Sequence, residues 1–331
     1  MVGVSTAARD AASSFARGYF ALQALLGAGW WIAVFASNDV RDWTLGEWDP
    51  AILIGPDLVL FVGASAFAAL RGSRVVAAIA ALWTTTVTIA LGAYGLIERM
   101  AGWGIVLMSA AMVGTLGSAA TIWFGRLPTR WFFAGPFSFR VADEASGVRH
   151  LRRSLAQLVV FWTAFLVVIP LILAVVEDRL RLNWQVEDRR FLDLGGAAVF
   201  TLGSVLGMWS CVTMALRGKG TPLPAETARH LVVAGPYRSV RNPMAVAGCV
   251  QTVGVGLWIG SWMVIVIAVV GSLVWNVIIR PEEEADLAER FGEPYRQYAA
   301  HVRCWIPTRP MARSMTQRGP EGSRDGQRTG S

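Results

Sequence analysis

Two short polar segments in the last third of the sequence combine residue types that can bind a small charged ligand. The first, AGPYRSVRNPM at 234–244, contains Arg238, Arg241 and Asn242. The second, RPEEE at 280–284, contains three successive carboxylates. Arginine and loop N–H groups bind carboxylates, whereas carboxylates bind amines and ribose hydroxyls. Together, the two segments would suit a ligand that carries both kinds of group.

Each segment taken alone also has a purely structural explanation. Asn242 can cap a following helix that has Pro243 in its first turn. The glutamates after Pro281 can start a helix, where negative charge favours the positive end of the helix dipole. Arg238 and Arg241 can contact lipid phosphates. The surrounding elements must therefore decide whether the two segments form a site.

The composition predicts a membrane protein. The chain has 331 residues, of which 54% are hydrophobic and only 16% charged, and its mean hydropathy is +0.46. A soluble domain normally has about 25% charged residues. Several apolar runs reach the roughly 20 residues that cross a bilayer core, and the alternation of outer-membrane barrel strands is absent. We therefore expect an all-α, polytopic transmembrane helical bundle.

The apolar runs define about eight membrane spans. The last two spans are separated only by a turn near Gly260, so they predict a C-terminal helical hairpin. Beyond it, Leu287 and Phe291 share one helix face, and Gly292 can end that helix. Short interfacial helices are therefore expected after the hairpin. The predicted spans are 18–36, 51–70, 75–97, 102–124, 155–176, 194–216, 244–259 and 261–279.

The distribution of basic residues predicts the orientation in the membrane. Loops assigned to the inside contain 15 Arg and Lys residues, and those assigned to the outside contain 6. The positive-inside rule then places both termini in the cytoplasm, in the plasma (inner) membrane. The net charge of +7 is explained by these loops facing anionic headgroups, so no nucleic-acid partner is expected.

The sequence divides into three regions. Residues 1–150 form an N-terminal four-span region of unknown role, and residues 151–309 form the domain that contains both polar segments. Residues 310–331 are rich in Gly, Ser, Arg and Gln, so we expect a disordered tail.

The cysteines have no metal-binding spacing, and no Ser-His-Asp or Cys-His set is present. The hairpin brings 235–243 and 280–284 to one membrane face.

The C-terminal part of the sequence resembles a known family. The run LVVAGPYRSVRNPM, an apolar hairpin, and then R-x-EEE-x-x-L-x-x-x-FG-x-x-Y-x-x-Y-x-x-x-V-x-x-W-I-P are similar to the isoprenylcysteine carboxyl methyltransferase family. That family is related to the phospholipid N-methyltransferases. The resemblance covers about 229–307. It implies transfer of a methyl group from S-adenosylmethionine to a carboxylate or amine of a lipophilic acceptor at the cytoplasmic face.

The resemblance also implies roles for individual residues. Arg280 would orient the acceptor, and Glu283 would act beside it in catalysis while also contacting the cofactor. Tyr295 and Tyr298 would close the pocket. The cofactor-binding residues implied in this way are Gly235, Pro236, Tyr237, Arg241, Asn242, Pro243, Glu283, Glu284, Tyr295 and Tyr298.

Two positions depart from the family pattern, and two other functions stay open. Ala245 stands where the family commonly has an aromatic residue, which could enlarge the acceptor pocket, and Asn242 replaces the histidine of many members.

One alternative function is that of an NADPH-dependent lipid or sterol reductase of related fold, although the phosphates of NADPH would require more cations. The other is a non-catalytic scaffold or a transporter. Transport would be supported by charged residues in mid-span, and the spans contain essentially none. The oligomeric state is not predicted.

Overall fold

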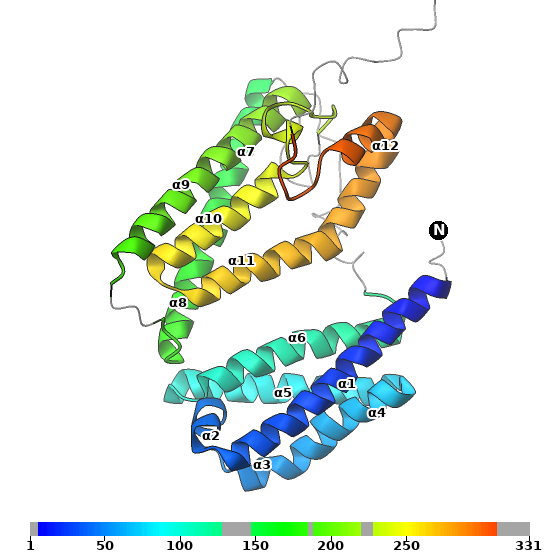
Figure 1. Ribbon diagram of the computed structural model, residues 1–331, viewed down its shortest axis with the longest axis vertical. Helices are drawn as coiled ribbons and strands as arrows, with labels where there is room; N and C mark the ends of the chain where they lie inside the picture. The colour runs from blue at the N-terminus through cyan, green and yellow to red at the C-terminus, as the bar shows by residue number, and fades with distance from the viewer. Residues whose placement is uncertain (1–5, 128–146, 185–187, 220–227, 310–331) are drawn as a thin grey trace, which may run out of the picture. The chain divides into compact units, whose positions relative to one another are not determined.

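The computed structural model describes residues 6–127, 147–184, 188–219 and 228–309 (Figure 1). These residues are all-helical and contain no strand, which confirms the predicted fold class. The predicted tail at 310–331 lies outside the described residues. The chain divides into two compact units, one of 1–131 with 175–183 and one of 132–174 with 184–331.

Seven of the described helical stretches are long and apolar enough to cross a membrane. An eighth apolar helix is shorter, with 17 residues. The protein is therefore an integral membrane protein with about eight spans, as the sequence predicts. The long stretches are Asp10–Ala36, Pro50–Arg71, Arg74–Glu98, Gly102–Phe124, Arg152–Arg179, Arg190–Gly218 and Trp262–His301, and the shorter helix is Pro243–Ile259.

The first unit is a bundle in which four long stretches pack around a small-residue core. Helix α1 packs against α4 and α6, and α5 packs against α4 and α6. Phe20 is fully buried in this core, among alanines such as Ala68 and Ala80. Its elements are α1 (Thr6–Ala36), α2 (Asn38–Thr44), α3 (Pro50–Asp57), the π-helix η1 (Leu58–Gly63), α4 (Ala64–Arg71), α5 (Arg74–Glu98) and α6 (Gly102–Phe124).

A buried carboxylate lies inside one of these membrane-crossing stretches. This is an exception to the expectation that the spans contain essentially no charged residue in their middle. Asp57 is 9% exposed, and its two oxygens accept hydrogen bonds from the indole N–H groups of Trp31 and Trp83, each at 2.8 Å. Because both oxygens are satisfied, Asp57 joins α1, α3 and α5 within the apolar bundle.

The second unit holds both polar segments. It comprises most of the chain after the first four spans, except that residues 175–183 at the end of α8 group with the first unit. Its elements are α7 (Gly147–Trp162), the π-helix η4 (Thr163–Val168), α8 (Ile169–Arg179), α9 (Arg190–Thr213), the π-helix η5 (Met214–Gly218), the 3-10 helix η7 (Gly235–Arg238), α10 (Pro243–Ile259), α11 (Trp262–Val274), the π-helix η8 (Trp275–Ile279) and α12 (Arg280–His301).

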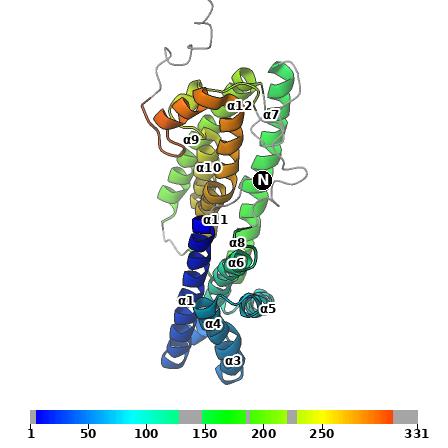
Figure 2. The same cartoon turned by 90° about the vertical axis from the view of Figure 1, so that its right-hand side faces the viewer.

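Helices α9 and α10 run side by side in both views (Figures 1 and 2) and pack along their length. Glycines allow their backbones to approach closely. A Cβ atom at Gly254 would lie 2.5 Å from the amide nitrogen of Phe200, and one at Gly203 would lie 2.8 Å from the side chain of Gln251. Gly254 therefore lies at the close contact between the two helices. At Gly248, by contrast, a Cβ atom would have no neighbour within 4 Å.

The predicted hairpin is formed by α10 and α11. Gly260 ends α10 with a φ of +69°, and the side chain of Ser261 accepts a hydrogen bond from the amide of Val264 to begin α11. The hairpin therefore places the start of α10 and the end of α11 near the same membrane face. This arrangement is the one that the two polar segments require.

The helix that leaves the hairpin does not stop at Pro281. The chain stays helical from α11 through η8 into α12, and α12 changes direction after η8 (Figure 1). The apolar part, Trp262–Ile279, is long enough to cross the membrane, so α12 begins outside it. Gly292 has non-helical backbone angles, with φ of 58°, and interrupts α12 where the sequence predicts a helix end.

Candidate active site

The loop before α10 is fixed by close contact with α9. Gly235 has a φ of +54°, which glycine adopts readily, and a Cβ atom there would lie 2.8 Å from Oγ1 of Thr213. Pro236 and Tyr237 are buried in the short helix that follows. The hydroxyl of Tyr298 donates a hydrogen bond of 2.6 Å to the carbonyl of Tyr237. These contacts anchor the loop against α9 on one side and α12 on the other.

The end of this loop starts α10 and also pairs with the C-terminal segment 302–308. The side chain of Asn242 accepts a hydrogen bond of 3.0 Å from the amide of Ala245, so it caps α10 as predicted. The amide of Arg241 donates to the carbonyl of Arg303 at 3.0 Å, and that of Thr308 donates to the carbonyl of Ser239 at 2.8 Å. The segment therefore lies along the loop, held by main-chain hydrogen bonds.

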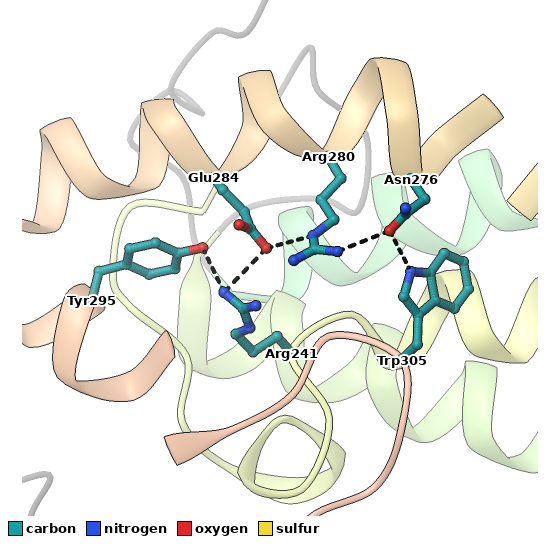
Figure 3. A network of polar contacts seen from close by, with 6 residues as sticks. All are labelled: Arg241, Asn276, Arg280, Glu284, Tyr295 and Trp305. Atoms are coloured by element: carbon teal, nitrogen blue, oxygen red, sulfur yellow. Dashed lines mark hydrogen bonds and ion pairs between the residues drawn. The ribbon is translucent and has the colours of Figure 1, made fainter. Parts of the chain in front are cut away.

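A chain of polar contacts joins the two predicted segments (Figure 3). Nη1 of Arg241 lies 3.1 Å from a carboxylate oxygen of Glu284 and 3.5 Å from the hydroxyl of Tyr295. The same oxygen of Glu284 accepts a hydrogen bond of 2.8 Å from Nε of Arg280. The loop and α12 thus meet as the sequence predicts, and the cationic and acidic side chains are within contact distance.

The network extends beyond Arg280 to Asn276 and Trp305, neither of which is among the predicted site residues. The side-chain oxygen of Asn276 accepts a hydrogen bond of 2.9 Å from Arg280 and one of 3.0 Å from the indole N–H of Trp305 (Figure 3). Asn276 thereby links η8, α12 and the C-terminal segment. A signal for it exists in the sequence, because it is an amide in an apolar span, four residues before Arg280.

Glu283 differs from its neighbour Glu284. Its partly buried carboxylate makes no hydrogen bond or ion pair with any residue that the structure describes. Burial, together with the negative charges of Glu284 and Asp286, raises the pKa of Glu283 to about 7. Since an ionised carboxylate without a partner is costly to bury, this position favours either a proton or a cationic ligand.

The tyrosines of α12 form part of a small core beneath the loop. Tyr295 and Tyr298 are both buried and pack with Val302. Burial is the largest cause that raises the pKa of Tyr295, which reaches about 12, and burial likewise raises the pKa of Tyr298. Both hydroxyls therefore stay protonated at neutral pH and can donate hydrogen bonds.

Several of the predicted site residues line a cavity of about 680 Å³ in the second unit. A volume of this size is typical of a small-molecule site. The predicted residues on its wall are Tyr237, Arg241, Asn242, Glu283, Glu284, Tyr295 and Tyr298. The others, Gly235, Pro236, Pro243 and Arg280, do not line it. Arg280 is instead held between Glu284 and Asn276.

The charged groups on the cavity wall are mostly paired with one another. Arg241 pairs with Glu284, and Arg290 lies 2.9 Å from a carboxylate oxygen of Asp286. Glu283 has no ion-pair partner among the described residues, so the described wall has an excess of negative charge. Two donor atoms of wall residues, Nε of Arg241 and Nη2 of Arg290, are also buried without a hydrogen-bond partner in the described chain.

The three π-helical segments described in the second unit all contribute to this wall. Phe165 of η4, Met214 of η5, and Trp275 and Ile279 of η8 line the cavity. Single π-turns within α-helices occur frequently at functional sites. Their position around one cavity is consistent with a binding site here.

Comparison with known families agrees with this location. Residues 192–294 match the family model described as phospholipid methyltransferase. The matched segment runs from α9 to the break in α12 and contains Arg241, Glu283 and Glu284. No curated protein and no solved structure matches the chain. The match indicates a membrane methyltransferase, within the broader group to which the isoprenylcysteine carboxyl methyltransferases are related.

Proposed function

We propose that the protein transfers a methyl group from S-adenosylmethionine to a carboxylate or amine of a lipophilic acceptor. The observation that carries this proposal is the carboxylate of Glu283, which lacks a partner among the described residues. It lies on the wall of a 680 Å³ cavity within the segment that matches the phospholipid methyltransferases. An unpaired carboxylate in such a place favours a ligand with positive charge or with hydroxyl donors.

The groups on the cavity wall fit S-adenosylmethionine. This molecule carries an ammonium, a sulfonium, ribose hydroxyls and a carboxylate. Glu283 can accept hydrogen bonds from the ammonium or the hydroxyls, and the guanidinium of Arg241, which also lines the cavity, can donate to the carboxylate. The amides of Tyr237, Ser239 and Arg241 already bond to carbonyls of the chain. Side chains rather than these loop amides therefore supply the polar contacts.

The cofactor supplies an electrophilic methyl group, and the residues of this chain position the reactants and exclude water. Glu283 is placed to hold the positively charged part of the cofactor. The side chain of Arg280 bonds to Glu284 and Asn276, so we assign it the positioning of Glu284 rather than direct contact with the acceptor. A carboxylate acceptor needs no base, whereas an amine must lose a proton.

The cavity fits the alternative functions less well. The phosphates of NADPH would require unpaired cations, but both arginines on the described wall are paired with carboxylates. Transport through the bundle would require accessible intramembrane charge, and the carboxylate of Asp57 is occupied by two indoles.

We further propose that the cavity mouth and both termini are cytoplasmic, in the plasma membrane, from the excess of basic residues in the corresponding loops.

Calorimetry on the detergent-purified, full-length protein tests the proposal. S-adenosylmethionine and S-adenosylhomocysteine should both bind with one site per chain, and NADPH should not bind. Absence of binding by both sulfur compounds, in a protein shown to be folded, would refute a methyltransferase function. Binding of NADPH alone would instead support the reductase alternative.

A further inference from the structure

The cavity has a charged end and a mostly apolar arm. The charged residues on its wall belong to the loop before α10 and to α12, whereas its membrane-embedded wall is formed by α7 with η4, α10 and α11. Along the continuous helix of α11 and η8, the wall extends from Ile279 of η8 back to Ile267 of α11. At 1.5 Å per residue, this corresponds to a depth of about 18 Å.

One side of this arm is aromatic. Phe161 and Phe165 both line the cavity, and their rings are stacked, with centroids 5.6 Å apart and planes 8° from parallel. Both residues precede the segment 192–294 that matches the methyltransferase family. This side of the cavity is therefore supplied by a part of the chain that the family match does not include.

The other side is widened by two glycines. Gly248 of α10 and Gly271 of α11 line the cavity, and a Cβ atom at either would have no heavy atom within 4 Å. They differ from Gly254 of α10, whose Cβ position is filled by the backbone of α9. Gly248 and Gly271 are thus not needed for helix packing, and the space beside them belongs to the cavity.

We propose that this arm binds the hydrocarbon chain of the methyl acceptor, and that Gly248 and Gly271 set the width of the chain that it accepts. The inference rests on the proposed function, because it takes the charged end as the site of methyl transfer. An apolar arm about 18 Å deep suits a long-chain lipid, whose burial against apolar walls is favourable. Phe161 and Phe165 form the flat wall against which the chain lies.

The test uses two photoactivatable probes, octadecanoic acid and octadecylamine, each with a diazirine in its chain. Both head groups are used so that the result does not depend on whether the acceptor is a carboxylate or an amine. The full-length protein is labelled in detergent, and the labelled residues are located by mass spectrometry. Labelling in the wild type should fall on the cavity-facing residues of η4, α10 and α11.

Gly248→Leu and Gly271→Leu should each lower this labelling by at least about tenfold, because the new side chain occupies the space of the probe. Gly195→Leu is the matched control, since Gly195 also faces open space in a helix of the same unit but does not line the cavity. It should label like the wild type. The Gly248→Ala/Gly271→Ala double variant adds only two methyl groups and should show an intermediate loss.

Binding of S-adenosylmethionine, measured in parallel, keeps the two proposals separate. Unchanged cofactor affinity with lost labelling supports the assignment of the arm. Equal labelling in the wild type, both leucine variants and the alanine double variant would overturn it, as would a comparable loss in Gly195→Leu. Wild-type labelling confined to outward-facing residues such as Val266 and Val269 would also overturn it. Labelling of the arm in a protein that binds no cofactor would contradict only the methyltransferase function.

Discussion

One carboxylate oxygen of Glu284 lies 3.1 Å from Nη1 of Arg241 and also accepts a hydrogen bond of 2.8 Å from Nε of Arg280. The carboxylate of Glu284 is thereby paired with two arginines of the same chain. The neighbouring carboxylate of Glu283 is the one that can serve a ligand. Two adjacent glutamates of the same motif therefore differ in their contacts: Glu284 is paired with two arginines, whereas Glu283 has no such partner among the described residues.

Glu283→Gln should weaken the binding of S-adenosylmethionine by about ten- to a hundredfold, because a charge-assisted hydrogen bond is lost. Calorimetry on the purified variant measures this. Glu282→Gln is the matched control, since it removes the same charge from the same turn of α12 at a position that does not line the cavity. Equal losses in the two variants would show that only the overall charge matters.

The affinity for S-adenosylmethionine should depend on pH through Glu283. Its pKa of about 7 in the free protein means that a proton must leave before the carboxylate can hold a cation. The dissociation constant should therefore decrease as the pH rises from about 5.5 to 7.5. A pH series of calorimetric titrations measures this slope, and Glu283→Gln should flatten it. A slope that persists in the variant would assign the titration to another group.

The same pKa has the opposite effect on the stability of the free protein. Burial raises the pKa of Glu283 from its ordinary 4.5 to about 7, so the folded state binds more protons than the unfolded state between these values. The contribution of Glu283 to stability is thus lost as the pH rises through this window. Thermal unfolding of the wild type should show this decrease, and Glu283→Gln should lack it.

Asn276 should act as a positioning residue for the C-terminal segment. Asn276→Leu removes the acceptor for Arg280 and Trp305, which should cost about 1–3 kcal/mol and accelerate dissociation of the cofactor. Asn276→Asp keeps an acceptor oxygen for both donors and should retain slow dissociation. The dissociation rate of radiolabelled S-adenosylmethionine and the protease sensitivity of 302–309 are the measurements. Identical behaviour of the two variants would exclude this role.

Gly235→Ala should destabilise the loop before α10 by about 1–3 kcal/mol. The φ of +54° is unfavourable for alanine, and its methyl group would meet Thr213 at 2.8 Å. Gly248→Ala is the control, because its methyl group would enter open space. Thermal denaturation followed by tryptophan fluorescence compares the two. A smaller effect at Gly235 than at Gly248 would contradict the close contact with α9.

Asp57→Asn should destabilise the first unit by about 1–3 kcal/mol although its shape is nearly unchanged. The new amide group would present N–H donors to one of the two indoles that now donate to Asp57. Asp49→Asn is a suitable control, because Asp49 caps α3 and asparagine caps equally well. Thermal unfolding in detergent measures both variants, and equal midpoints would remove the proposed role of the carboxylate.

Local chemistry predicts the hairpin and its ends well. Asn242 caps α10 because an amide oxygen before a proline suits that position, and Gly260 and Gly292 interrupt helices where positive φ is needed. The meeting of the loop before α10 with the start of α12 follows from the hairpin alone. These features depend on residues near each other in sequence or on one short connection.

What the sequence cannot supply is the direction in which each side chain points. Arg280 could face the acceptor or its own helix, and the contacts with Asn276 and Glu284 decide this. The link from Asn276 to Trp305 depends on where the C-terminal segment returns. Likewise, the aromatic wall of Phe161 and Phe165 lies far from the recognisable motif, and no local pattern connects it to the cavity.

The π-helix η8 sets the register of everything that follows it. A π-turn accommodates one residue more than an α-turn, and each residue advances an α-helix by about 100°. Removing one residue from Trp275–Ile279 would therefore rotate the whole of α12 by about that angle relative to α11. Glu283 would leave the cavity wall with no change in its own chemistry. The extra residue in this π-turn therefore determines which side of α12 faces the cavity.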